Sequence, residues 1–228
     1  MVVRFKIGGS LRFLSHAETL RVFQRACVRA GINLQYSRGF NPRPRMSLPL
    51  PRPVGVESDD ELLTLRARKS IRAQGHKSTR TQGHEARGTS DEVLIMDALC
   101  GQLPEGFELI SVNFAGARSS YQPCSVTYIF SVRPEFLDEQ LKNRIDDLMT
   151  SESLFIRRPI DEQKSNFKDM DVRSFISSME LEGGNIVVGC GVSSAGSIRV
   201  QEVLELLGLD EAMLASPIRR TNVQWRDG

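Results

Sequence analysis

Arginines recur along one predicted helix at a spacing that places them on a single face. Arg21, Arg25 and Arg29 are four residues apart, so on an α-helix they form one ridge. Such a ridge can follow a phosphate backbone, because the planar guanidinium group donates two parallel hydrogen bonds to phosphate oxygens. A solvated helix face often shows the same spacing, so the ridge alone does not identify a ligand.

A proline-rich stretch supplies further arginines without neighbouring acids. Residues 36–58 read YSRGFNPRPRMSLPLPRPVGVES, with no acidic residue before Glu57. Proline fixes an extended backbone, and the interspersed apolar side chains are expected to hold the stretch against the core. We therefore interpret it as an ordered basic loop and as the main candidate surface. Its candidate phosphate-binding residues are Arg38, Arg43 and Arg45, with Arg52 nearby; Tyr36 and Phe40 could stack on bases; Asn41 and Ser47 are polar contacts or turn residues.

The charge is unevenly distributed along the chain. Residues 1–52 contain ten Lys or Arg and one acidic residue. Residues 66–87 contain seven Lys or Arg and one acidic residue, although the net charge of the whole chain is only +2. This asymmetry indicates a polyanionic partner such as nucleic acid. Alternatively, a basic and an acidic half attract each other, and the charge pattern does not decide between the two.

His16 is the one histidine in a segment expected to be ordered. In the first turn of a helix, beside the arginine ridge, a neutral imidazole could act as a general base on a ribose hydroxyl. It also falls on an apolar stripe with Leu20, Phe23 and Cys27, where a structural histidine is the more common outcome.

A glycine- and serine-rich loop precedes a helix in the second half. Residues 189–199 read GCGVSSAGSIR, and backbone amides at a helix N-terminus can hold an anion. The alternative is a tight turn between a strand and a helix, since the spacing matches neither a Walker A loop nor G-x-G-x-x-G. The candidate anion-binding residues are Ser194, Gly196, Ser197 and Arg199.

No metal site is predicted. The four cysteines are far apart and form no C-x-x-C pair, which favours buried thiols over metal ligands. Residues 66–90 contain Q-G-H twice but little apolar surface, so we expect a mobile basic loop there.

Local signals predict the elements that carry these residues. "SHAE" at 15–18 is a capping box that begins a helix over 15–30, which Gly31 ends. Strands over 2–7, 32–36, 61–65 and 107–112, with a second helix over 91–100, give the order β-α-β-β-α-β of a ferredoxin-like unit. The second half predicts strands over 125–132, 153–158, 186–192 and 218–224 and helices over 134–149, 172–179 and 197–207. We expect an α+β protein of two ferredoxin-like halves packed together, residues 1–115 and 120–228.

The N-terminal motifs resemble those of a known family. They are "LSH" at 14–16, "YSRGFNPRP" at 36–44, Ser47 and "PVGVES" at 53–58, followed by "DVRSFI" at 171–176, "GSIRVQEVL" at 196–204 and "RRTNV" at 219–223. Together they resemble the radical-SAM-linked proteins, a bacterial family whose activity is unassigned. The basic segment over 66–90 departs from that family's pattern.

The resemblance implies an accessory role beside a radical SAM enzyme. This chain lacks C-x-x-x-C-x-x-C, so the iron–sulfur cluster and SAM are expected in a partner protein, with no cofactor bound by the chain itself. The first hypothesis is therefore that the protein is a non-enzymatic module that binds RNA or another phosphate-rich ligand. The alternatives are a metal-independent RNA-processing enzyme that uses His16, and a subunit that only docks a radical SAM protein. With no apolar run long enough to span a membrane and no signal peptide, a cytoplasmic location is expected.

Overall fold

The structure is a computed structural model that describes residues 1–68, 90–116, 119–159 and 167–227. It forms two compact units, unit 1 over Met1–Gln122 and unit 2 over Pro123–Arg226. Each has a mixed α/β composition, with strands and helices alternating in part along the chain. No helix in these residues is long and apolar enough to cross a membrane.

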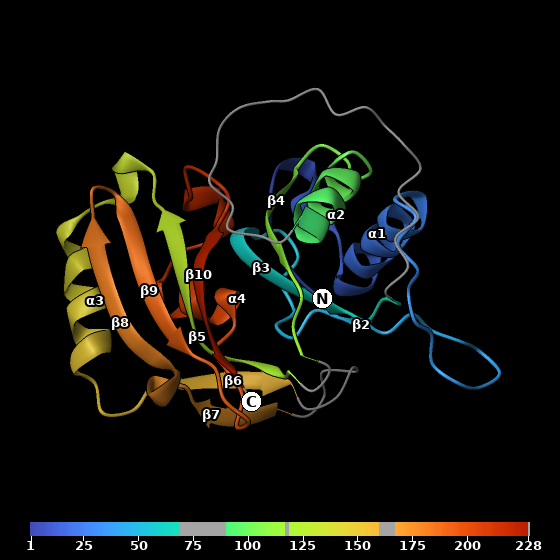
Figure 1. Cartoon of the computed structure of the whole chain (residues 1–228). Helices are drawn as coiled ribbons and strands as arrows, with labels where there is room; N and C mark the ends of the chain where they lie inside the picture. Colours follow the sequence, from blue (N-terminus) through green and yellow to red (C-terminus); the bar gives the residue numbers. More distant parts are fainter. Residues whose placement is uncertain (69–89, 117–118, 160–166, 228) are drawn as a thin grey trace. The chain divides into compact units, whose positions relative to one another are not determined.

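Unit 1 is an antiparallel sheet with two helices. The strand order is β4-β1-β3, and β2 also pairs with β3; each of these pairs is antiparallel. Figure 1 shows α1 and α2 beside one another in this unit. The elements are β1 (Val2–Ile7), the 3₁₀ helix η1 (Gly9–Phe13), α1 (His16–Arg29), β2 (Met46–Ser47), β3 (Glu57–Leu65), α2 (Ser90–Cys100) and β4 (Phe107–Asn113).

The core of unit 1 follows from the alternation of β1. Val3, Phe5 and Ile7 are buried in one cluster with the apolar faces of α1 and α2, because successive side chains of a strand point to opposite faces. Phe5 packs against Phe23 of α1 with ring centroids 4.6 Å apart, and Phe107 lies 5.3 Å from Phe23. These tilted and edge-on ring contacts join the sheet to the helix.

The prediction for α1 is confirmed in detail. The Ser15 hydroxyl accepts a hydrogen bond from the Glu18 amide at 3.3 Å, and the Glu18 carboxylate accepts one from the Ser15 amide at 2.9 Å. The chain leaves the helix through Gly31, whose φ of 72° is left-handed and suits glycine.

The strand predicted over 32–36 is wrong. That segment makes only isolated bridges, Leu34 with Ala67 and Tyr36 with Pro44. The second strand is the two-residue β2, inside the proline-rich stretch. Prolines at 42 and 44 remove the amide donors that a longer ladder over this segment would need.

In unit 2, four neighbouring strands of the main sheet have the order β10-β5-β9-β8, and β6 pairs with β7 in a separate two-stranded sheet. The elements are β5 (Tyr121–Ser131), η2 (Pro134–Phe136), α3 (Glu139–Thr150), β6 (Phe155–Pro159), β7 (Phe167–Asp171), η3 (Arg173–Phe175), β8 (Ile176–Glu182), β9 (Asn185–Gly191), α4 (Val200–Leu207), η4 (Glu211–Met213) and β10 (Arg219–Asp227).

The helix predicted over 172–179 is wrong. One 3₁₀ turn is followed by strand β8, which pairs antiparallel with β9. Val172, Phe175, Ile176 and Met179 are buried at the i, i+3, i+4, i+7 spacing of a helix. The Gly183–Gly184 turn, with φ of 53° and 87°, nevertheless joins β8 to β9 as a tight hairpin, so strand pairing overrides the helical period.

The mixed α/β class is thus observed, whereas two ferredoxin-like halves are not confirmed. The predicted helix over 134–149 begins only at Glu139, where the Asp138 carboxylate caps the Leu141 amide at 2.8 Å. The helix predicted over 197–207 begins at Val200. Strand β7 was not predicted from the sequence.

Candidate nucleic-acid interface

Residues 35–45 form a hydrogen-bonded loop that we call the hairpin loop. The Arg45 amide donates to the Gln35 carbonyl at 2.8 Å, and the Ser37 amide donates to the Arg43 carbonyl at 2.8 Å. The Arg43 amide in turn donates to the Ser37 hydroxyl at 2.9 Å. These three bonds tie the two arms together, so the tip over 38–42 is held at a defined place. Figure 1 draws the hairpin loop as the light-blue extension beyond α1 and β2.

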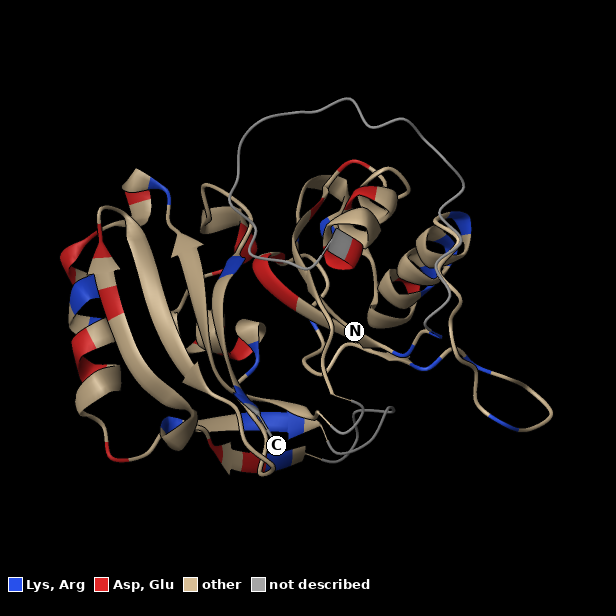
Figure 2. Ribbon diagram, viewed as in Figure 1, with Lys and Arg blue, Asp and Glu red and all other residues tan. Residues whose placement is uncertain are grey.

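The tip of the hairpin loop is aromatic and basic. Phe40 is fully exposed, with a relative accessibility of 106%. Arg38, Asn41 and Arg43 around it are exposed as well, and Figure 2 shows the cationic residues in blue along this loop. Tyr36 on the first arm is 43% exposed. An exposed ring with exposed arginines on the same loop is the combination that binds unpaired bases and their phosphates.

The apolar residues of the proline-rich stretch differ in burial. Leu48 is buried at 6% relative accessibility, as expected of an anchoring side chain, whereas Val54 is 54% exposed and Phe40 fully exposed. The expectation that these side chains hold the stretch to the core is therefore correct for Leu48 and wrong for the other two.

A cavity of about 1060 Å³ opens at the base of the hairpin loop, within unit 1. Of the residues that the structure describes, the arginines lining it are Arg45, Arg66 and Arg68. Hydrogen bonds hold the backbone of Arg66 and Arg68 in place. The Arg66 amide donates to the Arg45 carbonyl at 2.9 Å, and the Arg68 amide donates to the Asn33 carbonyl at 2.8 Å. Ser47 of β2 lines this cavity and also a smaller neighbouring one of about 350 Å³.

Sequence reasoning missed most of this cavity. Arg66 and Arg68 were assigned to a mobile basic loop over 66–90 because of its composition; positions 69–89 lie outside the described residues. Asn33, Phe114 and Tyr121, which also line the cavity, carry no motif. The order of the strands, rather than any local signal, brings these segments together.

The arginine ridge of α1 is exposed but separate from the cavity. Arg21, Arg25 and Arg29 are all exposed, in agreement with the predicted helix face, and none of the three is among the described residues that line the cavity. The Arg29 guanidinium donates to the Gln102 carbonyl at 2.9 Å, so it also ties α1 to the end of α2. The ridge and the hairpin loop belong to consecutive segments of unit 1.

Arg52 has a structural role that the sequence did not indicate. Its guanidinium donates to the backbone carbonyls of Arg12 at 2.7 Å, Leu14 at 3.0 Å and Pro53 at 3.2 Å, and to that of Val56. A single side chain thereby joins the proline-rich stretch to η1 and to the start of α1. Arg52 is a fold-stabilising residue and not an outward-facing phosphate ligand.

His16 is exposed at the first position of α1. It lines a cavity of about 10 Å³ together with Thr19, Arg52 and the buried Glu61. A space of that size holds about one water molecule and has no room for a ribose. Among the described residues, this cavity shares none with the larger cavity lined by Arg45, so His16 lies outside the arginine-lined cavity.

The candidate anion loop of unit 2 contains a tight turn followed by an ion-pair network. The Ser193 amide donates to the Gly196 carbonyl at 3.0 Å, and Gly196 has a φ of 126°. Ser194 is exposed and makes none of the hydrogen bonds described for the loop.

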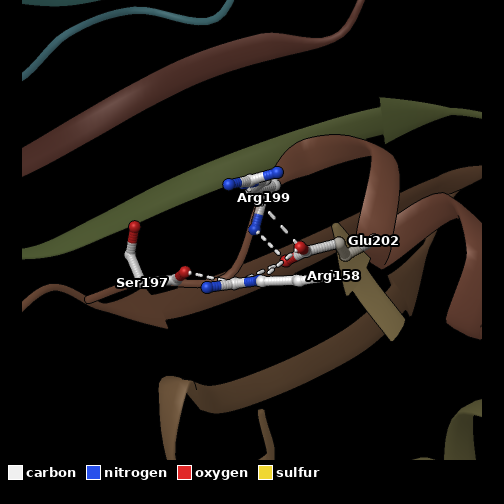
Figure 3. A network of polar contacts seen from close by, with 4 residues as sticks. All are labelled: Arg158, Ser197, Arg199 and Glu202. Carbon is white, nitrogen blue, oxygen red and sulfur yellow. Dashed lines mark hydrogen bonds and ion pairs between the residues drawn. The ribbon is translucent and has the colours of Figure 1, made fainter. Parts of the chain in front are cut away.

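The buried Glu202 carboxylate accepts two bonds of 2.7 Å from the Arg158 guanidinium and one of 2.7 Å from the Arg199 amide. Arg158 also donates to the Ser197 carbonyl at 2.8 Å. Figure 3 shows these four residues, which we call the Glu202 network. The Glu202 carboxylate therefore already takes the place at the start of α4 where an anion would bind. This favours the alternative that the loop is a tight turn between a strand and a helix.

The described residues contain no group of three His, Cys, Asp or Glu side chains that could hold a metal ion. Cys27 and Cys190 are buried as expected, whereas Cys100 is exposed, contrary to expectation. Burial raises the pKa of Cys27 and of Cys190 to about 12, so both remain protonated thiols at neutral pH.

These observations define an α/β protein whose first unit presents a basic, aromatic hairpin loop beside an arginine-lined cavity. Residues 1–81 match a family described as "Uncharacterized protein conserved in bacteria (DUF2344)". The matched segment includes α1, the hairpin loop and three of the strands of unit 1. A search of curated proteins found no match to the chain.

Proposed function

We propose that unit 1 binds single-stranded RNA through the hairpin loop. The observation that carries this proposal is the fully exposed ring of Phe40, held on a hydrogen-bonded loop between the exposed Arg38 and Arg43. Unpaired bases offer planar faces to aromatic rings, while arginines bind the phosphates between them. A duplex hides those faces, which is why the single-stranded form is the better ligand.

The neighbouring charges support the same ligand. Arg45 at the base of the loop and the ridge of Arg21, Arg25 and Arg29 add exposed cations in consecutive segments. Asn41 at the tip and Ser47 in β2 are exposed as well, so both can hydrogen-bond to sugar or phosphate oxygens. In this role the protein is a binding module that needs no catalytic group.

Binding to a fluorescent single-stranded RNA, followed by anisotropy over a range of salt concentrations, tests the proposal. Log affinity should fall linearly with log salt, and each of Arg38→Gln and Arg43→Gln should make the slope shallower by about 0.7. Phe40→Ala should weaken binding about tenfold without changing the slope, because stacking releases no counterions.

Arg157→Gln is the matched control. Arg157 is an exposed arginine of unit 2, with 75% of its side chain accessible, and its replacement should leave both affinity and slope unchanged. No binding at low salt, or an affinity that does not respond to salt, would refute the proposal.

We also propose a ferredoxin-like fold for unit 1 and a radical SAM enzyme as the protein's partner. The antiparallel order β4-β1-β3, with the two-residue β2 also paired to β3 and with α1 and α2 as connections, supports the fold. The partner rests on the resemblance of the N-terminal motifs alone. Co-purification with a radical SAM protein that persists after ribonuclease treatment would support direct docking, and its loss would indicate a link through RNA.

A further inference from the structure

The cavity at the base of the hairpin loop is far larger than a packing defect. Its volume of about 1060 Å³ lies at the upper end of the range for small-molecule sites. Among the described residues, its walls come from several separate parts of unit 1: the start of β1, residues 32–35, β2 with Arg45, the end of β3 with residues 66–68, the start of α2, and residues 114–116 with Ser119 and Tyr121. A recess built from several rigid elements is the usual form of a ligand site.

The charge of the cavity favours an anion. Arg45, Arg66 and Arg68 line it against a single acidic residue among the described ones, Asp91. Burial, and then the charge of Arg66, lower the pKa of the Met1 amine that also lines the cavity. The excess of arginine over acidic residues, with the smaller effect of the Arg66 charge on the Met1 amine, indicates a positive potential inside. Guanidinium groups at a concave surface bind phosphate in a forked geometry.

The remaining walls favour a planar organic group attached to that anion. Ile32 and Leu65 are buried beneath the cavity, and the rings of Phe114 and Tyr121 line its side. Asn33 also lines the cavity, and its side-chain amide can both donate to and accept from a base edge. Apolar and aromatic walls, an amide and a cluster of arginines together fit a base, its sugar and its phosphate.

We propose that this cavity binds the phosphorylated terminal nucleotide of the RNA that lies along the hairpin loop. This inference rests on the proposed function and adds that the protein prefers RNA with a phosphorylated end. The connection is structural, because Gln35 and Arg45 close the base of the hairpin loop by a hydrogen bond of 2.8 Å and both line the cavity. A strand that follows the loop inward reaches the cavity at this pair, and there the arginines meet its terminal phosphate.

The test compares three RNA oligomers of one sequence that carry a 5′-phosphate, a 3′-phosphate or hydroxyls at both ends. One phosphorylated form should bind at least about tenfold more tightly than the hydroxyl form, the effect of one or two charge-assisted hydrogen bonds. In Arg68→Gln this ratio should fall toward one, whereas in Arg157→Gln, the matched control in unit 2, it should persist. Equal affinity for all three oligomers, or a preference that survives in Arg66→Gln/Arg68→Gln, overturns the inference.

Free nucleoside monophosphates separate this inference from the proposed function. Calorimetric binding of a nucleoside monophosphate that Arg68→Gln weakens about tenfold supports the cavity as a nucleotide site, even for a protein that fails to bind RNA. If RNA binds with the expected salt slope but shows no preference for a phosphorylated end, the hairpin loop remains the RNA interface and the proposed role of the cavity is overturned. Absence of binding to both RNA and monophosphate overturns both.

Discussion

The hairpin loop of unit 1 and the Glu202 network of unit 2 are both rich in arginine, but their arginines have different partners. Arg38 and Arg43 are exposed on a loop whose own hydrogen bonds use backbone groups and one serine hydroxyl. Arg158 has only 17% of its side chain accessible, and its guanidinium is occupied by the Glu202 carboxylate and the Ser197 carbonyl (Figure 3).

This difference decides which arginines can bind a ligand. A guanidinium group carries five donors, and when carboxylates or carbonyls of the chain accept them, a phosphate must compete with those bonds. Arg52 in unit 1 resembles Arg158 in this respect, although it lies in the same proline-rich stretch as Arg43 and Arg45. Position in a basic segment is therefore a weaker guide to function than the acceptors around each side chain.

The largest effect is expected from breaking the Glu202 network. Arg158→Met leaves a buried carboxylate, 10% accessible, without its bidentate partner, and should lower the free energy of unfolding by about 3 kcal/mol or more. Trp225, the only tryptophan, lies in β10, so its fluorescence during urea denaturation follows unit 2.

The neighbouring Arg157→Met supplies the control, because Arg157 is 75% accessible and lies 3.9 Å from Asp169. Its replacement should change the free energy of unfolding by less than about 0.5 kcal/mol. The double variant Arg158→Met/Glu202→Leu should recover most of the lost stability, since neither charge remains buried. An Arg158→Met protein as stable as the parent would show that the network is not a stabilising element.

A smaller loss is expected when Arg52 is replaced. Arg52→Gln removes charge-assisted bonds to backbone carbonyls of Arg12 and Leu14 and should cost about 2 kcal/mol in the free energy of unfolding. Arg52→Lys should restore little, because one ammonium group cannot reach acceptors that a planar fork spans. Urea denaturation followed by circular dichroism measures both variants.

Arg45→Gln is the counterpart for Arg52, since Arg45 is an exposed arginine of the same stretch. Its replacement should leave the urea midpoint within error, because exposed arginines contribute little to stability. If Arg45→Gln and Arg52→Gln destabilise equally, the distinction between ligand-facing and fold-stabilising arginines in this stretch is wrong.

The same contrast explains what could be predicted from the sequence. Helix α1 was predicted with its cap because Ser15, Glu18 and Gly31 act on backbone groups within a few residues. Strand β1 was predicted because alternation is a local pattern. The exposed ridge of Arg21, Arg25 and Arg29 follows from helical spacing in the same way.

Features fixed by distant residues could not be predicted. Arg158 and Glu202 are 44 positions apart, and the acceptors Arg12 and Leu14 lie 40 and 38 positions from Arg52. Strand β8 has a helical apolar period and becomes a strand only because β9 lies beside it. The cavity likewise depends on strand order, so its arginines at 66 and 68 were visible in the sequence while their common location was not.

The smallest effect concerns the carboxyl of Asp171, which positions another arginine engaged within unit 2. Its carboxylate accepts hydrogen bonds from the amides of Arg173 at 3.0 Å and Leu154 at 2.9 Å, while the Arg173 guanidinium donates to the Met149, Ser151 and Ile176 carbonyls. The amide bonds from Arg173 and Leu154, followed by the charge of Arg173, lower the pKa of Asp171 below its ordinary 3.8.

A lowered pKa in the folded state means that the folded protein binds fewer protons than the unfolded chain between the two pKa values. The contribution of Asp171 to stability is therefore complete above the unfolded value of 3.8 and is lost as the pH falls through the folded value. Asp171→Asn should lower the urea midpoint of unit 2, measured by Trp225 fluorescence, at about pH 7, and the difference from the parent should shrink toward about pH 3.

Glu18→Gln tests the equivalent carboxyl in unit 1, where the Ser15 hydroxyl and then the Ser15 amide lower the pKa of Glu18. The destabilisation by Glu18→Gln, measured as the shift of the urea midpoint by circular dichroism, should likewise shrink as the pH falls through the folded pKa of Glu18. A difference between Asp171→Asn and the parent that stays constant from about pH 7 to about pH 3 would mean that the asparagine disturbs the loop sterically. In that case the ionised carboxylate does not hold Arg173 in place, and the contrast with the exposed arginines of unit 1 would rest on Arg52 and Arg158 alone.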